Sequence, residues 1–353
     1  MKVMSKPVTK IAVICGHKSP FPYANEGKLA NYGGASRFWE SVIKHANETG
    51  YNTTHEFHII GRTGSRTTEN VANVHEVFSP PDRSIYRSEA YRYALSLNPT
   101  AIICEHPSLV PPDIADFPVP MFSRVVGYKY KGFIREGVHY FTNSNHGNRH
   151  YGQNWPVIHQ TTLLDETRYK EKKNNYMIFM SNLTRAFKEK GLERAIRLSA
   201  LSGKPLNVVG PWGDEGRKAH ERLLYLISEY NAPVTYTGAV YGEQKAVEIC
   251  SAFAALYPID CPEMGSTFAI ECAFSGTPMI TNANGCMPEY VRDDETGYVL
   301  PVDATDEDYL DVIACAESAT YGLDPADCFN HATKQFHPAK IARELIELVE
   351  SKV

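Results

Sequence analysis

The chain of 353 residues is longer than one hydrophobic core usually supports, and its composition, 43% hydrophobic and 22% charged, is that of a globular protein of two domains. The formal net charge of −5 argues against binding to nucleic acid through the overall charge of the chain, although a local basic surface can still bind nucleic acid. No apolar run approaches the length that crosses a bilayer, and residues 1–6 lack the apolar core of a signal peptide, so we expect a cytoplasmic protein.

Short apolar runs rich in β-formers alternate with helical patterns in the first half of the chain. We predict strands at 10–15, 56–60, 100–104, 120–125 and 138–142, and helices at 35–49 and 83–97. This alternation is typical of a parallel sheet covered by helices.

The second half repeats the pattern. We predict strands at 176–180, 206–210, 234–238, 254–258, 278–281 and 297–301, and helices at 192–201, 216–229, 243–253, 267–275 and about 306–318. Residues 147–166 show few periodic positions, which indicates a domain boundary there. The sequence therefore predicts an α/β protein of two Rossmann-like doubly wound parallel-sheet domains, 1–155 and 156–335, with a ligand cleft between them.

The segment 257–271 is the most informative part of the sequence. A buried strand leads into a loop with Gly265 and then into a helix, for which Ser266 or Thr267 is a good N-cap. The backbone N–H groups of Ser266, Thr267 and Phe268 would then point out of the helix start. Such a terminus is a natural site for a diphosphate.

Two glutamates flank this helix start. Glu263 lies on the loop before it and Glu271 about one turn inside the helix, so both carboxylates can accept hydrogen bonds from a ligand rich in hydroxyls. Taken alone, two such glutamates are more often ordinary carboxylates at a helix start or on a surface. The pattern that follows them reverses this interpretation: the turn 276–278 reads Gly-Thr-Pro, and two glycine- and glutamate-bearing loops follow at 284–289 and 294–299.

The ordered set resembles glycosyltransferase family four, the large group of retaining GT-B enzymes also called glycosyl transferases group 1. The resemblance implies that Glu263 contacts hydroxyls of the transferred sugar, Glu271 the nucleotide ribose, and the loop amides the diphosphate. This chain departs from the family at 264–266, where Met-Gly-Ser replaces the usual Gly-Phe-Gly. The resemblance also implies that a C-terminal helix, here 336–353, packs back across the domain junction.

The resemblance further implies two cations at the diphosphate, placed five positions apart. Arg185 and Lys190 have that spacing, and Lys188 is a competing candidate for the second cation. Because the family's arginine normally follows the strand at once, an insertion of three residues here could have moved it. A solvated basic loop is the alternative interpretation.

In the first domain, the glycine pair Gly33 and Gly34 resembles the pair that lets backbone amides approach the donor phosphates, although an ordinary turn would use the same glycines. His106 ends a buried strand, at the position where the family often has a histidine that faces the donor sugar. A structural histidine is about equally compatible with the sequence.

The expected reaction transfers a sugar from a nucleotide diphosphate donor with retention, and the leaving phosphate takes the acceptor's proton. No cofactor or metal is expected: the acidic run 306–308 imitates a metal signature, but Thr305 before it reads as a helix N-cap. The sequence shows neither a nicotinamide-type glycine fingerprint nor a P-loop.

The acceptor is predicted to bind the first domain. Residues 122–151 interleave cations with aromatic side chains, and Arg124, Lys129 and Lys131 are the candidate contacts. Such a surface suits a saccharide or cell-envelope glycan, or a hydroxymethylated base of phage DNA. The alternatives are that these residues are core and ordinary surface, and that the whole chain is a non-catalytic binding protein for nucleotide sugars or saccharides.

Overall fold

The computed structural model describes residues 8–16, 34–62, 65, 73–77, 83–112, 116–213, 215–318 and 322–353. The chain forms two compact units: unit 1 comprises residues 1–161 and 338–353, and unit 2 comprises residues 162–337. The unit boundaries lie after residues 161 and 337, where the sequence predicts domain boundaries after residues 155 and 335. None of the described helices is long and apolar enough to cross a membrane.

Unit 1 is built on a six-stranded parallel sheet of order β3-β2-β1-β4-β5-β6. Its strands are β1 (Thr9–Ile14), β2 (His55–Arg62), β3 (Asn73–Val77), β4 (Ala101–Cys104), β5 (Met121–Val125) and β6 (Val138–Thr142). The strand order reverses between β1 and β4, and ligands of doubly wound sheets bind at the carboxyl ends of strands at such a point.

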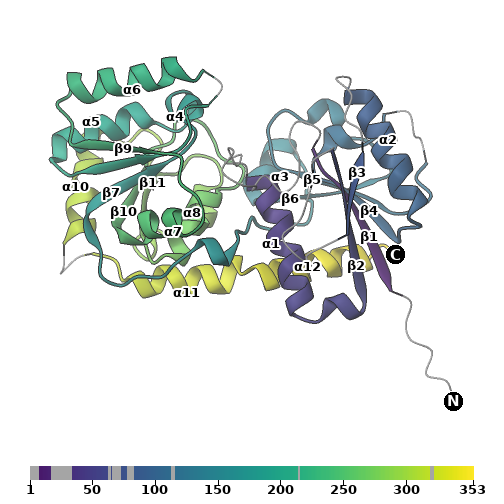
Figure 1. Ribbon diagram of the computed structural model, residues 1–353. Helices are drawn as coiled ribbons and strands as arrows, with labels where there is room; N and C mark the ends of the chain where they lie inside the picture. The colour runs from purple at the N-terminus through teal and green to yellow at the C-terminus, as the bar shows by residue number, and fades with distance from the viewer. Residues whose placement is uncertain are drawn as a thin grey trace. The chain divides into compact units, whose positions relative to one another are not determined.

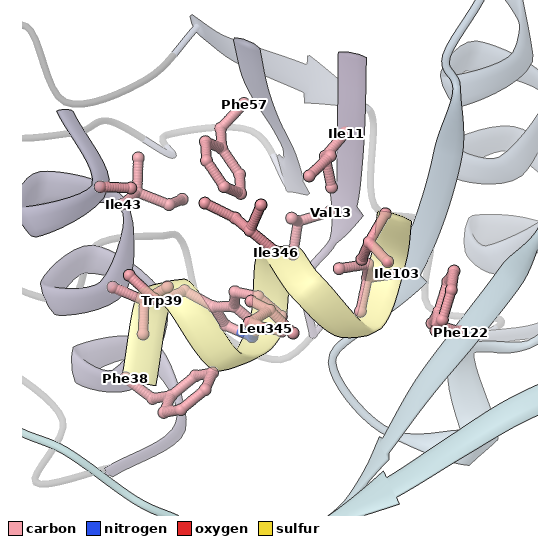
Figure 2. Packing of buried hydrophobic residues seen from close by; sticks show 14 of the residues in the cluster. Ile11, Val13, Phe38, Trp39, Ile43, Phe57, Ile103, Phe122, Leu345 and Ile346 are labelled. Atoms are coloured by element: carbon pink, nitrogen blue, oxygen red, sulfur yellow. The ribbon is translucent and has the colours of Figure 1, made fainter. Parts of the chain in front are cut away.

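Alternating side chains of β1 supply both cores of unit 1. Ile11 and Val13 pack with α1 (Gly34–Glu48) and α12 (Pro338–Glu350), whereas Ala12 and Ile14 pack with α2 (Arg83–Ser96). Figure 2 shows Ile346 of α12 beside Phe57 of β2 and Val13 of β1. The helix formed by residues 338–350 therefore completes the core of the first half of the chain.

Unit 2 repeats the architecture with the sheet order β12-β11-β10-β7-β8-β9, again all parallel. Its strands are β7 (Asn174–Met180), β8 (Leu206–Val209), β9 (Val234–Gly238), β10 (Ala252–Tyr257), β11 (Met279–Asn282) and β12 (Gly297–Leu300). Each coincides with a predicted strand to within two residues at either end. The strand order reverses between β7 and β10.

Helices cover this sheet, with α5 and α6 on one side and α7 and α8 on the other (Figure 1). The helices are α4 (Leu183–Glu189), α5 (Leu192–Ser202), α6 (Arg217–Glu229), α7 (Gly242–Ser251), α8 (Thr267–Phe274), α9 (Met287–Tyr290), α10 (Asp306–Glu317) and α11 (Pro325–Phe336). Of these, α4, α9 and α11 were not predicted as helices. The loops that follow β7, β10 and β11 meet at one edge of the sheet because these three strands are parallel neighbours.

Candidate functional site

The start of α8 lies at that edge of unit 2, directly after the loop that follows β10. Ser266 is the N-cap, and its Oγ accepts a hydrogen bond of 3.2 Å from the backbone N–H of Ala269, as the sequence predicts. The N–H groups of Thr267 and Phe268 have no partner inside the helix, because the first residues of any helix lack one. Gly265 directly precedes the cap, and the N–H groups of a helix start favour an anion.

The Glu263 carboxylate is held beside this helix start by two side chains. Its Oε1 accepts hydrogen bonds from Lys190 Nζ at 2.5 Å and from the Tyr257 hydroxyl at 3.1 Å. The Lys190 side chain is only 5% exposed and that of Glu263 16%, so the ion pair is shielded from water. Burial and the neighbouring Glu263 carboxylate raise the pKa of Tyr257 well above its usual value, which keeps the phenol as a donor.

Glycines fix the backbone of the same loop. Gly285, at φ +70°, forms a β-bridge with Glu263, and a Cβ there would lie 2.2 Å from the Glu263 nitrogen. Gly191, also at φ +70°, approaches so closely that a Cβ would lie 1.8 Å from the Pro258 carbonyl oxygen. Only glycine fits such positions. The loop that carries Glu263 is therefore clamped between the end of α4 and the loop after β11.

The predicted cations are placed differently from one another. Arg185 lies on α4 with its side chain 61% exposed, and its Nε and Nη2 donate to Glu189 Oε2 at 2.9 and 2.6 Å. Lys188 is also exposed and pairs with Glu215. Of these cations, Lys190 is the one that contacts Glu263.

Glu271 lies within α8 and is buried. Its Oε1 accepts hydrogen bonds from Lys245 Nζ at 2.7 Å and Thr162 Oγ1 at 3.1 Å, and the same ammonium donates to Glu166 Oε2 at 2.6 Å. Lys245, Thr162 and Tyr257 were not among the site residues predicted from the sequence. The available signal for Lys245 was its place on the core-facing side of α7, where its neighbours are apolar.

In unit 1, the ends of β1 and β4 carry Gly16, Glu105 and His106. The Gly16 N–H donates to Glu105 Oε2 at 2.6 Å, and burial raises the pKa of that carboxyl. His106 is half-buried, with Nδ1 2.7 Å from Ser108 Oγ and its ring stacked on Tyr130 at a centroid distance of 5.6 Å. Gly34 is the first residue of α1, whereas Gly33 lies outside the described residues.

The three residues predicted to bind the acceptor have different surroundings. Lys129 and Lys131 are exposed beside Tyr130. Arg124 is fully buried in unit 1, with its guanidinium 3.5 Å from the centroid of the Phe38 ring and Nη2 donating to Gln160 at 2.5 Å. A side chain so enclosed presents no surface to an acceptor, so we assign Arg124 to the core.

The acidic run 306–308 is the start of a helix, as predicted. Thr305 caps α10 in a reciprocal capping box with Asp308, and Asp306 pairs with Arg194 and Arg197. Within the described parts of the chain, no three histidine, cysteine, aspartate or glutamate side chains are grouped as metal ligands.

Two doubly wound parallel-sheet units define the GT-B fold of glycosyltransferases, and solved structures agree over nearly the whole chain. A glycosyltransferase of avilamycin A biosynthesis has 19% identity and a TM-score of 0.72, with 98% of each chain covered. Sucrose-phosphate synthase from Thermosynechococcus elongatus has 16% identity and a TM-score of 0.80, covering 97% of this chain and 98% of that one. Anabaena HepE, in complex with UDP and glucose, has 15% identity and a TM-score of 0.67, covering 97% and 100%.

The match to a family model lies in unit 2. Residues 164–321 match the model of the family described as glycosyl transferases group 1. No curated protein sequence matches the chain.

Proposed function

We propose that this protein is a retaining, metal-independent glycosyltransferase that moves a sugar from a nucleoside diphosphate sugar to an acceptor hydroxyl. The observation that carries the proposal is the shielded Lys190–Glu263 pair, whose carboxylate lies on the loop just before the start of α8. An ammonium and helix N–H groups favour a diphosphate, and the adjacent carboxylate accepts hydrogen bonds from sugar hydroxyls. Support for the nucleotide comes from HepE, whose solved complexes contain UDP or UDP-glucose.

Four side chains of unit 2 have a role in this scheme. Glu263 binds the transferred sugar through Oε2, because its two hydrogen bonds among the described residues both end on Oε1. Lys190 and the N–H groups at the start of α8 offset charge on the leaving diphosphate. Arg185 reaches the same phosphates after releasing Glu189, and Glu271 accepts a hydrogen bond from the ribose.

Unit 1 supplies the remaining contacts. His106, whose Nδ1 lies 2.7 Å from Ser108 Oγ, contacts the transferred sugar, and the glycine pair Gly33 and Gly34 contacts the donor phosphates. The acceptor oxygen attacks the anomeric carbon from the face that the diphosphate leaves, and a phosphate oxygen takes the acceptor's proton. This scheme depends on positioning and charge stabilisation, for which the clustered groups are suited, and it needs no protein nucleophile.

The acceptor in this proposal is a saccharide or cell-envelope glycan bound near Lys129, Lys131 and Tyr130. Exposed cations next to an aromatic ring suit an anionic glycan, and they also suit a hydroxymethylated base in phage DNA. Replacing both lysines with alanine should weaken acceptor binding more than donor binding, and equal effects on both would remove this assignment.

The test of the donor chemistry is a panel of UDP-, GDP- and ADP-sugars incubated with the protein in the presence of a chelator. Thermal stabilisation by one donor, slow diphosphate release and a product of unchanged anomeric configuration by NMR would support the proposal. Stabilisation without any turnover, even with acceptors added, would favour a non-catalytic nucleotide-sugar binder. Unchanged turnover after alanine substitution of Glu263, Glu271, Arg185 and Lys190, each tested singly, would exclude the assigned site.

A further inference from the structure

Lys245 is a buried cation that has no role in the reaction proposed above. It lies in α7, its residue is 2% exposed, and its neighbours along the core-facing side of the helix are Ala246 and Ile249. An ammonium is rarely buried without ionic partners, because removing it from water is costly. Its position therefore requires an explanation.

The partners of Lys245 come from two different segments of unit 2. Its Nζ lies 2.7 Å from Glu271 Oε1 on α8 and 2.6 Å from Glu166 Oε2 on the short helix of residues 164–166. Two carboxylates thus share one ammonium, and Thr162 adds a neutral donor to the same Glu271 oxygen at 3.1 Å. Both hydrogen bonds of the Glu271 carboxylate in the described structure end on Oε1.

This arrangement fixes which carboxylate oxygen a ligand can use. Because Oε1 accepts hydrogen bonds from Lys245 and Thr162, the Glu271 carboxylate cannot turn about its terminal bond without losing both of them. The shared ammonium also gives the buried Glu271 carboxylate a positive partner 2.7 Å away. An acceptor that is already held in one orientation loses less conformational freedom on binding a hydroxyl than a freely rotating one.

We propose that Lys245 is a positioning residue that holds Glu271 Oε1 so that Oε2 accepts a hydrogen bond from a ribose hydroxyl of the donor. The inference rests on the proposed nucleotide-sugar function and extends it. Lys245 touches neither substrate nor diphosphate in this scheme, and it acts only through Glu271. Its loss should therefore reduce recognition of the ribose specifically, and leave recognition of the diphosphate intact.

The test compares the binding of UDP with that of 2′-deoxy-UDP and 3′-deoxy-UDP by titration calorimetry, with the GDP or ADP series used if the wild type prefers those bases. The wild type should prefer the ribonucleotide over at least one deoxy form by about tenfold or more in Kd, the usual range for a hydrogen bond to a charged acceptor. The Lys245→Met/Glu166→Gln double variant removes the cation together with one of its two anions, so no pair of carboxylates is left facing each other. Its preference should fall to within about threefold.

A matched control separates positioning from general structural support. Lys173 is a half-buried lysine of unit 2, and its Nζ donates to the carbonyls of Cys250 and Ser275 and to Thr277 Oγ1, none of which belongs to the Glu271 carboxylate. Lys173→Met should lower the melting temperature and keep the full ribose preference. Should the double variant not fold, Lys245→Gln/Glu166→Gln keeps a neutral donor at Glu271 and should show an intermediate preference.

The outcomes distinguish the two proposals. A folded Lys245 variant that retains the wild-type ribose preference overturns the positioning role, as does a wild type that binds UDP but shows no preference over either deoxy form. In both cases the donor function stands. A wild type that binds none of the nucleoside diphosphates overturns the proposed function and this inference together.

Discussion

The carboxyl edges of the two sheets handle buried charge in different ways. At the edge of unit 2, Glu263 is paired with Lys190 and Glu271 with Lys245, with oxygen–nitrogen distances of 2.5 and 2.7 Å. At the edge of unit 1, the buried Glu105 is met by the Gly16 N–H, and the pKa of its carboxyl is raised by burial. Among the described residues of this edge, the His106 ring is stacked on that of Tyr130.

This difference matches the different demands on the two edges in the proposed reaction. A diphosphate and a developing charge at the anomeric carbon require fixed ionic groups that need no reorganisation when the reaction occurs. The proposed anionic glycan acceptor is better served by aromatic rings with exposed cations beside them, such as Tyr130 with Lys129 and Lys131. Among the described residues, the same sheet architecture therefore carries two carboxylate–ammonium pairs at the edge of unit 2 (the ionic edge) and a stacked imidazole–phenol pair at the edge of unit 1.

The largest effect should come from breaking the ionic edge at Lys190. Lys190→Met leaves the Glu263 carboxylate without its cation, and we expect diphosphate release from the donor to slow by about 10²- to 10³-fold, the usual cost of losing one group that stabilises the transition-state charge. Steady-state release of diphosphate measures it. The control is Lys188→Met, whose exposed ammonium pairs with Glu215. An equal loss in the control would show that general positive charge, and not the shielded pair, matters.

The second test concerns the rigid backbone of the ionic edge. Gly191→Ala places a Cβ within 1.8 Å of the Pro258 carbonyl oxygen, so we expect the free energy of unfolding to fall by about 3 kcal/mol, combining steric overlap with left-handed backbone strain. Gly203→Ala is the matched control, because Gly203 has φ +66° and open space around its Cβ position. It should cost about 1 kcal/mol, from strain alone. Urea denaturation compares the two, and equal losses would contradict the close contact.

The smallest effect should appear at the unit 1 edge, in Glu105→Gln. Burial raises the pKa of Glu105 in the folded protein above its unfolded value, so the wild type loses stability as the pH rises through the folded pKa. Glutamine carries no titrating proton and can still accept from the Gly16 N–H. The variant should therefore gain stability relative to the wild type as the pH increases, by on the order of 1 kcal/mol. Thermal melts of the variant and the wild type across pH 4–8 measure the difference in stability. A difference that stays constant with pH would contradict the expected loss of stability from the buried carboxylate.

Most of the fold was predictable because buried parallel strands have a strong local signature. Runs such as Ala252–Tyr257 are apolar at most positions, and every strand of unit 2 was predicted. The missed strand β3 reads Asn-Val-His-Glu-Val at a sheet edge, where half-exposed polar residues give no continuous apolar run. Helix α11 was missed although it packs against α8, because its apolar positions are few and interrupted by polar ones.

The candidate site was predictable where it follows from consecutive residues and not where it depends on long-range contacts. The Ser266 cap and the order of Glu263 and Glu271 are local features, so the sequence contains them. The contacts of Lys190 with Glu263 and of Lys245 with Glu271 join residues 73 and 26 positions apart. Arg124 was misassigned because its stacking on Phe38, which removes it from the surface, is a tertiary contact that charge patterning does not reveal.

The place of α12 in unit 1 has a consequence for synthesis of the chain. Ile341, Leu345 and Ile346 belong to the core shared with β1 and α1, so the ribosome must finish residues 338–350 before that core can close. Unit 2 is continuous in sequence and is complete at residue 337. Domains usually fold in the order in which they are synthesised. Here synthesis of unit 2 is finished before that of unit 1, although unit 2 begins later in the sequence. Until then, the apolar surface of β1 and α1 that α12 covers lacks its cover.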